Sequence, residues 1–253
     1  MLLTNRVALI TGAGGGLGHA IAEAFTREGA SVLIHDLRPE ARAIAEQIGG
    51  VFIQADLTNR AAVRDLAKQA LEPSGRVDIL VNNAGFQHID SVEKFPEEIW
   101  DQMLQVMLTA PFQLIKYLLP GMRQRGWGRI INIASIHGMV ASPFKSAYVS
   151  AKHGLLGLTK TVGLEAGAAG VTVNAICPAY VRTPLVERQI ADQARIHGIS
   201  EAAVVDQVML APAAIKRLIE PGEVADLAVF LASDQASAIT GASFPIDLGW
   251  TAH

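Results

Sequence analysis

The stretch VALITGAGGGLGHAIAEAF (7–25) decides the fold of this chain. It opens with the apolar run VALIT (7–11), passes through the glycine-rich turn TGAGGGLG (11–18) and continues as a helical segment. A strand, a glycine turn and a helix in this order are typical of the first unit of a doubly wound α/β sheet, where the helix N-terminus can bind phosphates. We therefore predict a fold that binds a dinucleotide.

The glycines of this turn have separate expected tasks. The spacing is not G-x-G-x-x-G, because Leu17 stands where the third glycine would fall. We expect Gly12 to form the tight turn, Gly16 to let the backbone approach a pyrophosphate, and Gly18 to allow close helix packing. A glycine turn without a ligand is the alternative, and the strand–turn–helix context disfavours it. The predicted cofactor contacts here are Gly12, Gly14, Gly15, Gly16, Leu17 and Gly18.

Further apolar runs alternate with helical stretches along the rest of the chain. Each run is apolar on both alternating sets of residues, as a sheet buried on both faces requires. The helical connections predict right-handed crossovers and a parallel sheet. The further strand candidates are SVLIHD (31–36), VFIQAD (51–56), DILVNN (78–83), RIINIAS (129–135) and VTVNAIC (171–177). No linker interrupts the pattern, so we predict a single Rossmann-type α/β domain over residues 1–253.

Two helical segments carry specific expectations. Residues 97–125 are predicted to form one long helix, in which Pro111 produces a kink or a local break. The segment 183–220 follows a strand end, begins Thr-Pro and is more polar, so we predict a mobile helical lid over the substrate.

The composition excludes several classes of protein. Half of the 253 residues are hydrophobic and 18% are charged, so a sizeable core can form. The formal charge of −3 argues against a nucleic-acid partner. The single cysteine, Cys177, excludes an intrachain disulfide and a cysteine-rich metal site, and we expect no metal. Since neither a signal peptide nor an apolar run of about 18 residues is found, we expect a soluble cytoplasmic protein without a membrane partner.

The end of the second predicted strand bears on the choice of cofactor. Asp36 stands there, where an acid can accept hydrogen bonds from the adenosine ribose hydroxyls and repel a 2′-phosphate. NAD is therefore expected rather than NADP. Arg38 complicates this choice because a guanidinium can bind a phosphate, but the glycine turn carries no basic residue to assist it. A solvated loop acid or a helix cap is the alternative for Asp36.

Residues after two other strands complete the expected cofactor site. Asp56 and Leu57 can flank the adenine, although Asp56 can equally cap the next helix. The neighbouring Asn82 and Asn83 can cap backbone groups or contact the ribose, and both possibilities stay open. The predicted contacts in this region are Asp56, Leu57, Asn83, Ala84 and Gly85.

A candidate catalytic pair stands in SAYVSAKHG (146–154). Tyr148 and Lys152 are four residues apart, so a helix places them on one face, and Ser135 lies thirteen residues before the tyrosine. A free tyrosine titrates near pH ~10. We expect the ammonium of Lys152 to lower the pKa of the phenol toward neutrality, so that it can exchange protons with an alcohol or a ketone.

These motifs resemble the short-chain dehydrogenase/reductase family in their order and spacing, over nearly the whole chain. They are TGAGGGLG (11–18), NNAG (82–85), Ser135 and Tyr148-x-x-x-Lys152. Within the family, several stretches are similar to bacterial D-3-hydroxybutyrate dehydrogenases. Those stretches are GFQH (85–88), GWGRIINIAS (126–135), HGMVASPFKSAYVSAKHG (137–154), GLTKTV (157–162), NAICP (174–178), TPLVERQ (183–189) and the ending GWTAH (249–253).

The resemblance implies roles for the catalytic residues. Tyr148 is the general base in oxidation and the acid in reduction, and Ser135 hydrogen-bonds the oxygen that becomes the carbonyl. Lys152 binds the nicotinamide ribose and lowers the pKa of the phenol. The resemblance also implies that NAD is contacted by Tyr148, Lys152, Pro178, Val181 and Thr183. It further implies a homotetramer.

The resemblance also implies a site for a small hydroxy acid, with Lys145 facing its carboxylate and Trp250 as an apolar wall. Independently, such a substrate needs a cation for the carboxylate and polar donors to orient it. Lys145 and His137 lie between Ser135 and Tyr148, which suits a pocket position. A structural histidine and a surface lysine are the alternatives. The predicted substrate contacts are Gln87, Ser135, His137, Lys145, Tyr148, Gln189 and Trp250.

Three positions depart from the family pattern. Met107 stands where the family commonly has an asparagine that takes part in a proton relay, and a thioether is a poor hydrogen-bond partner. Ala179 and Leu248 replace family glycines, and they would be strained if those positions need a positive φ.

The expected activity is the reversible, NAD-dependent oxidation of D-3-hydroxybutyrate to acetoacetate. One alternative is a reductase of another small keto or hydroxy compound or of a 3-oxoacyl thioester. The polar set around Lys145 argues against a large neutral substrate. The other alternative is a dinucleotide-binding sensor without turnover, against which the intact Ser135, Tyr148 and Lys152 argue.

Overall fold

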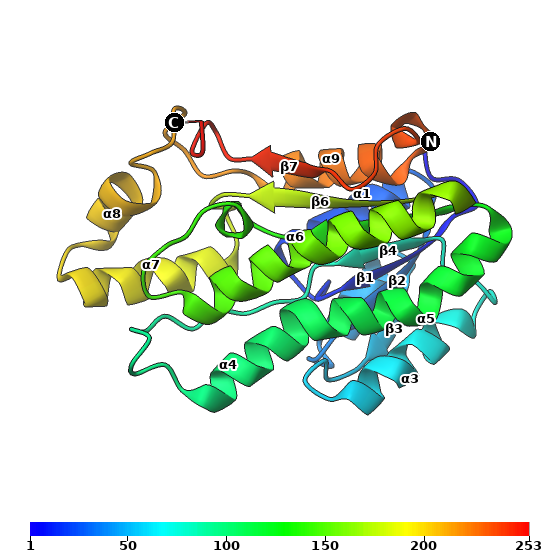
Figure 1. Ribbon diagram of the computed structural model, residues 1–253, viewed down its shortest axis with the longest axis horizontal. Coiled ribbons are helices and arrows are strands. Elements are labelled where there is room, and N and C mark those ends of the chain that lie inside the picture. Colours follow the sequence, from blue (N-terminus) through cyan, green and yellow to red (C-terminus); the bar gives the residue numbers. More distant parts are fainter. Residues whose placement is uncertain (253) are drawn as a thin grey trace.

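The computed structural model describes residues 1–252, apart from the side chains at positions 188, 193, 196 and 197; His253, the end of GWTAH, lies outside the described residues. Seven strands form one parallel sheet in the order β3-β2-β1-β4-β5-β6-β7 (Figure 1). This confirms the predicted doubly wound α/β fold. The strands are β1 (Val7–Thr11), β2 (Ser31–Asp36), β3 (Val51–Gln54), β4 (Ile79–Asn82), β5 (Gly128–Ile133), β6 (Val171–Pro178) and β7 (Ser243–Ile246).

The last strand, β7, was not predicted. Its four residues, SFPI, lie at the sheet edge beside β6, are not fully buried, and contain Pro245. A proline cannot donate to a strand ladder, which confines it to edge strands and hides the strand from a pattern search. The six predicted strands all form, with bounds that differ from the prediction by no more than two residues.

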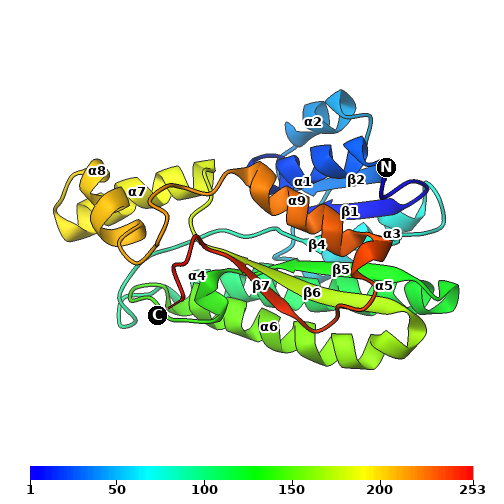
Figure 2. The same ribbon diagram turned by 90° about the horizontal axis from the view of Figure 1, so that it is seen from above.

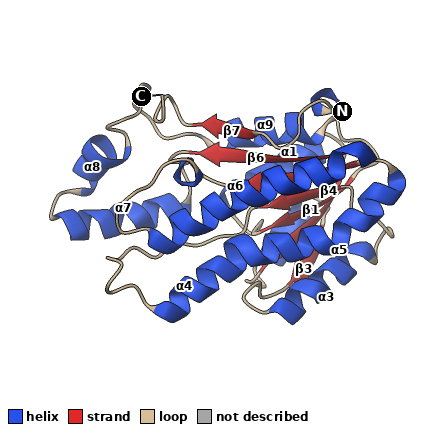
Figure 3. Ribbon diagram, in the orientation of Figure 1, coloured by secondary structure: helices blue, strands red, loops and turns tan. Residues whose placement is uncertain are grey.

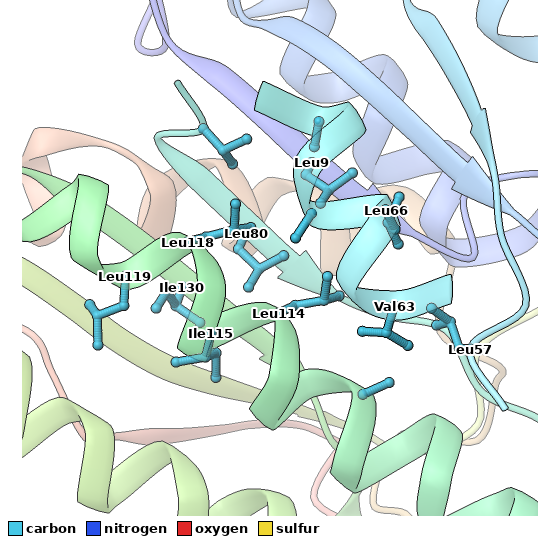
Figure 4. Close-up of a cluster of buried hydrophobic side chains, with 14 of the residues drawn as sticks. Leu9, Leu57, Val63, Leu66, Leu80, Leu114, Ile115, Leu118, Leu119 and Ile130 are labelled. Carbon is cyan, nitrogen blue, oxygen red and sulfur yellow. The ribbon is translucent and has the colours of Figure 1, made fainter. Parts of the chain in front are cut away.

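Helices cover both faces of the sheet, as Figures 2 and 3 show. On one face lie α1 (Gly16–Arg27), α2 (Ala41–Gln47) and α9 (Pro221–Ala232). On the other lie α3 (Arg60–Leu71), α4 (Glu97–Leu104), α5 (Ala110–Arg125) and α6 (Ser146–Ala166). An apolar cluster fills each interface. Figure 4 shows the cluster on the face covered by α3 and α5. The sheet contributes Leu9, Leu80 and Ile130, and the two helices contribute Leu66 and Leu114.

The long helix predicted over 97–125 is interrupted, as expected from Pro111. A π-helical turn, Gln105–Thr109, separates α4 from α5, and Pro111 lies in the first turn of α5. A proline ring collides with the carbonyl of the residue four positions earlier in an α-helix, which here is Met107. The wider π turn around Met107 accommodates that proline. Turns of this kind are frequent at functional sites.

A buried chain of hydrogen bonds ties α6 to the sheet. The Asn82 side-chain amide of β4 donates to Asn132 Oδ1 of β5 at 2.8 Å, and Asn132 donates to Thr159 Oγ1 at 2.8 Å. Thr159 in turn donates to the Leu155 carbonyl, one turn back on α6, at 2.8 Å. These bonds hold the rotation of the helix that carries Tyr148.

The segment 183–220 forms α7 (Pro184–His197), α8 (Glu201–Val204) and a π-helical turn (Val205–Met209). These helices lie beyond the C-terminal ends of the strands (Figures 1 and 2). The C-terminal turn of the chain holds this segment, because the Trp250 indole N–H donates to the Met209 carbonyl at 3.0 Å. The Leu248 carbonyl also accepts from the backbone of Ala214 at 2.8 Å. That the segment moves as a lid stays a prediction.

The two replaced glycines behave differently. Leu248 has a φ of 57°, so the expected strain is present there. Ala179 is not among the described residues with a positive φ, and its position therefore needs no glycine. Within the described part of the chain, no helix has both the length and the apolar character needed to cross a membrane.

Candidate active site

A cavity of about 700 Å³ lies at the C-terminal ends of the strands. The strand order reverses between β1 and β4, and ligands of doubly wound sheets bind in the crevice beside such a reversal. The cavity walls contain every residue predicted to bind the cofactor, the three predicted catalytic residues and the polar substrate residues Gln87, His137, Lys145 and Gln189. Of the predicted site residues, Trp250 alone does not line it.

The glycine turn forms a close-fitting cradle at one end of the cavity. Gly12 has a φ of 65°, and a Cβ built on it would lie 2.8 Å from the Cα of Ala84. A Cβ on Gly18 would collide with the carbonyl of Gly12. Helix α1 begins after Gly15 with no side-chain cap and no acidic residue in its first turn. Its free N–H groups therefore fit the pyrophosphate of a dinucleotide.

Asn83 closes this cradle from the β4 side. Its side-chain amide donates to the Thr11 carbonyl at 2.9 Å and to the Gly12 carbonyl at 3.1 Å. Of the two possibilities left open by the sequence, the backbone cap is therefore observed.

Asp36 lies at the end of β2, where it can accept from the adenosine ribose. Its Oδ2 accepts from the Gly14 N–H at 2.9 Å, and its Oδ1 accepts from the Arg38 backbone at 3.0 Å and from Arg38 Nε at 3.2 Å. Burial by itself raises the pKa of Asp36, but these hydrogen bonds outweigh it and the net pKa is lowered. The carboxylate is therefore ionised and holds Arg38 beside the glycine turn.

Two residues near the adenine end take local structural roles. Asp56 accepts from Thr58 N at 2.9 Å and so forms a turn, whereas Asn59 is the residue that caps α3.

Sequence reasoning missed His35, which is buried in β2. Its ring lies 3.4 Å from Gly12 N and 3.1 Å from the Ala55 carbonyl, and so joins the glycine turn to the end of β3. The sequence signal was a histidine inside an otherwise apolar strand.

The predicted catalytic residues converge on the middle of the cavity. Ser135 follows β5, and its Oγ accepts from the His137 backbone N–H at 3.1 Å. Lys152 donates its Nζ to the Ile133 carbonyl at 2.7 Å and lies 5.5 Å from the ring centroid of Tyr148. Both Tyr148 and Lys152 come from the first turns of α6, on the face predicted from their spacing.

The prediction that the pKa of the Tyr148 phenol is lowered is wrong for the protein chain by itself. Burial raises the pKa of the phenol, and a hydrogen bond with Ser135 offsets this only in part. Lys152 does not reverse the shift, because its ammonium is turned to the Ile133 carbonyl and burial lowers its own pKa to about 8. Loss of hydration thus outweighs the attraction between phenolate and ammonium at this separation.

The four polar substrate residues form two pairs. Lys145 Nζ lies 3.4 Å from His137 Nε2, and Gln189 of α7 donates to the Gln87 side-chain oxygen at 3.1 Å. Burial lowers the pKa of Lys145 to about 8, and burial together with the charge of Lys145 lowers the pKa of His137 to about 3. The imidazole is therefore neutral and the lysine mostly protonated at pH 7.

The first pair fixes the tautomer of His137. An ammonium can only donate, so Nε2 of His137 accepts and the ring proton resides on Nδ1. Among the described residues, Gln87 Nε2 is buried without a hydrogen-bond partner, whereas the His137 ring has the Val140 backbone as a neighbour that raises its pKa in part. Buried polar groups are rarely left unpaired without a functional reason. The ammonium of Lys145 and the amide of Gln87 belong to the same cavity and fit a carboxylate.

Aromatic rings surround His137. Its ring makes edge-to-face contacts with Tyr148 at 6.4 Å, Tyr180 at 6.5 Å and Trp250 at 6.1 Å between centroids. Trp250 thus contacts His137 within the same chain but does not line this cavity, and a contribution to the wall from a neighbouring subunit stays a prediction. Tyr180, which sequence reasoning missed, lines the cavity and places its ring 5.5 Å from Lys145 Nζ. No motif in the sequence pointed to it.

Met107 is packed as an apolar residue. It is buried, and a Cβ on Gly85 would lie 3.1 Å from its sulfur. Its side chain therefore covers the loop after β4.

The fold and the cavity together indicate an oxidoreductase that uses a nicotinamide dinucleotide, with Ser135, Tyr148 and Lys152 in the cavity wall. The sequence profile of a family described as enoyl-(acyl carrier protein) reductase matches residues 12–251. The chain belongs to the short-chain dehydrogenase/reductase family.

Individual relatives match the chain over its full length. A protein of Rhizobium meliloti named D-beta-hydroxybutyrate dehydrogenase is 47% identical over 98% of this chain and 100% of its own length. A Bacillus subtilis protein named as an uncharacterized oxidoreductase is 46% identical over 99% of this chain and 100% of its own. A Cupriavidus necator protein, again named D-beta-hydroxybutyrate dehydrogenase, is 42% identical over the whole of both chains.

Proposed function

We propose that this protein oxidises D-3-hydroxybutyrate to acetoacetate with NAD, reversibly. The observation that carries the proposal is the group of Lys145, His137 and Gln87 beside Tyr148 in one cavity. The ammonium of Lys145 and the amide of Gln87 suit a short carboxylate, and the names of two relatives point to the same substrate. A small hydroxy acid is therefore the substrate class that the site favours.

Orientation is the main contribution of the polar residues. A carboxylate held by Lys145 and His137 places the hydroxyl two carbons away within reach of Tyr148, because all three line the same cavity. The Gln189–Gln87 pair closes the site from the α7 side. Fixing one end of a four-carbon substrate in this way lets the enzyme discriminate between this substrate and neutral alcohols of similar size.

Proton transfer falls to Tyr148. Once Tyr148 has lost its own proton, its phenolate takes the proton of the substrate hydroxyl, and Ser135 donates a hydrogen bond to the oxygen as it becomes a carbonyl. A bound nicotinamide dinucleotide supplies the acceptor for the hydride that leaves the hydroxyl-bearing carbon. Lys152 holds a positive charge on the same face of α6. In the reverse direction Tyr148 returns the proton to the keto oxygen.

NAD is the proposed cofactor because Asp36 is ionised at the end of β2. Its hydrogen bonds lower its pKa, and its charge disfavours a 2′-phosphate. The homotetramer, the cytoplasmic location, the single-domain boundaries and the individual site residues stay predictions.

The reaction itself tests the proposal. We expect the purified protein to form NADH from D-3-hydroxybutyrate and NAD, with a preference over the L-enantiomer, butan-2-ol and a 3-hydroxybutyryl thioester. Tyr148→Phe should abolish turnover and keep NAD binding, measured by calorimetry. A preference for the thioester would instead support a 3-oxoacyl reductase. NAD binding without turnover of any substrate would support a sensor, and full activity of Tyr148→Phe would remove this residue as the base.

A further inference from the structure

The backbone at Phe144 is unusual. Its φ is 64°, in the left-handed region that bulky side chains rarely adopt. Among the described residues other than glycine, only Asn5 and Leu248 share a positive φ. Such a conformation persists only where the surrounding structure determines it, and it is concentrated at functional sites.

The chain passes from the surface to the interior at this point. Phe144 is 39% exposed, whereas Lys145, the next residue, is 1% exposed. Lys145 is also the residue that precedes the first turn of α6. The left-handed step thus lies between an exposed loop and the buried ammonium of the cavity.

A backbone hydrogen bond joins this step to the segment after β4. The Asp90 N–H donates to the Phe144 carbonyl at 3.0 Å. Asp90 follows Gln87 by three residues, in the irregular segment after β4. The loop that ends at Lys145 and the loop that carries Gln87 are therefore connected beside the substrate end of the cavity.

We propose that Phe144 is a positioning residue: its left-handed backbone, braced by Asp90, holds Lys145 inside the cavity at a set distance from Gln87. The role in substrate binding rests on the proposed function, while the placement of Lys145 does not. A change of φ to a negative value rotates the 144–145 peptide. Either the bond from Asp90 is lost, or the start of α6 moves and takes Lys145 with it.

The left-handed backbone at Phe144 accounts for the burial of Lys145. A lysine beside an exposed loop would ordinarily extend into solvent, because burying an ammonium without a carboxylate partner is costly. Among the described residues no carboxylate forms an ion pair with Lys145. Its ammonium lies beside His137 Nε2 and over the ring of Tyr180. Backbone geometry, rather than charge pairing, therefore keeps this ammonium inside.

Two substitutions separate the backbone from the side chain. Phe144→Asn and Phe144→Val both remove the phenyl ring, but asparagine adopts the left-handed conformation readily and a β-branched residue does not. The first measurement is the rate at which acetic anhydride acetylates Lys145, followed by mass spectrometry of its peptide. We expect slow labelling in the native protein and in Phe144→Asn, and labelling at least about tenfold faster in Phe144→Val.

The second measurement is the KM for D-3-hydroxybutyrate. We expect Phe144→Val to raise it at least about tenfold, the loss expected for a hydrogen bond to a charged group, and to leave the KM for NAD unchanged. Phe144→Asn should keep both values. Asn5→Val is the matched control, because it places the same strain at a φ of 62° next to β1 and should change neither KM nor Lys145 labelling.

The labelling result decides the inference independently of the substrate. Equal protection of Lys145 in Phe144→Val and Phe144→Asn would overturn it, even if the enzyme oxidises D-3-hydroxybutyrate. Faster labelling only in Phe144→Val would support it, even if another carboxylate proves to be the substrate. Equally fast labelling in both variants would assign the effect to the phenyl ring and would also overturn the proposal.

Discussion

Lys145 Nζ lies 3.4 Å from His137 Nε2, and both side chains are buried in the cavity that Tyr148 lines. The contact fixes the imidazole proton on Nδ1 and leaves the ammonium with hydrogens to donate. Its charge also helps keep His137 neutral, since the pKa of the imidazole is lowered to about 3. Of these two residues, Lys145 is therefore the one whose charge changes as the pH rises above neutrality.

The first prediction concerns pH. Burial lowers the pKa of Lys145 to about 8, so its charged form prevails below that pH and is lost as the pH rises through it. We expect the KM for D-3-hydroxybutyrate to be constant below about pH 8 and to rise above it. The measurement is the KM across the range from pH 6 to pH ~10, with NAD saturating.

Lys145→Met is the matched variant, because it keeps an unbranched side chain of nearly the same length without its charge. It should raise the KM for the hydroxy acid about ten- to a hundredfold, as the loss of a charge-assisted hydrogen bond implies, and flatten its dependence on pH. The KM for NAD should not change. Equal effects on the two KM values would remove Lys145 from the substrate site.

The second prediction concerns the cofactor. Asp36 both holds Arg38 beside the glycine turn and repels a 2′-phosphate. Asp36→Asn removes that charge and frees the guanidinium, so we expect the preference for NAD over NADP to fall by about tenfold or more, a change of about 1.4 kcal/mol. The measurement is kcat/KM for each cofactor at a fixed concentration of hydroxy acid.

Adding Arg38→Ala to this variant provides the control. The double variant should lose the gain with NADP, because no cation remains to receive the phosphate. If Asp36→Asn leaves the ratio of kcat/KM for NAD to kcat/KM for NADP unchanged, other residues of the site determine the choice of cofactor.

The third prediction concerns Met107. Its buried side chain packs against Gly85, so Met107→Leu should keep the turnover and change the free energy of unfolding by less than about 1.5 kcal/mol. Met107→Asn buries an amide and should cost about 1–3 kcal/mol, which lowers the melting temperature by roughly 2–4 °C per kcal/mol. Thermal unfolding and kcat are measured for both variants.

These two variants also test the proton relay. Slower turnover in Met107→Leu would contradict a purely apolar role for the thioether. A several-fold higher kcat in Met107→Asn would mean that proton transfer limits turnover and that an amide at this position assists it.

The glycine turn, six of the seven strands and the Tyr148–Lys152 spacing were predictable because they are local. Strand and helix periodicity, the turn residues and an i, i+4 pair all act within a few positions of the chain. The carboxyl ends of parallel strands meet at one edge of the sheet, so the predicted cofactor residues converge there. The edge strand β7 escaped because its proline and short length obscure the pattern.

The pKa of Tyr148 was mispredicted for a different reason. The spacing places Lys152 on the right face, but it does not reveal that the Ile133 carbonyl binds the ammonium or that water is removed from the phenol. Likewise, no motif indicates the ring of Tyr180 beside Lys145 or the position of Trp250 behind His137. These depend on how distant segments pack.

The sequence by itself determined the parallel sheet, the phosphate-binding turn and the predicted cofactor residues at the ends of the strands, because short-range chemistry and strand order are sufficient for them. Only the tertiary structure decided the protonation states, the unpaired amide of Gln87, and the inward turn of Lys145 after Phe144. The reason is physical: hydration, electrostatic interaction and backbone bracing depend on neighbours that are close in space and far apart along the chain.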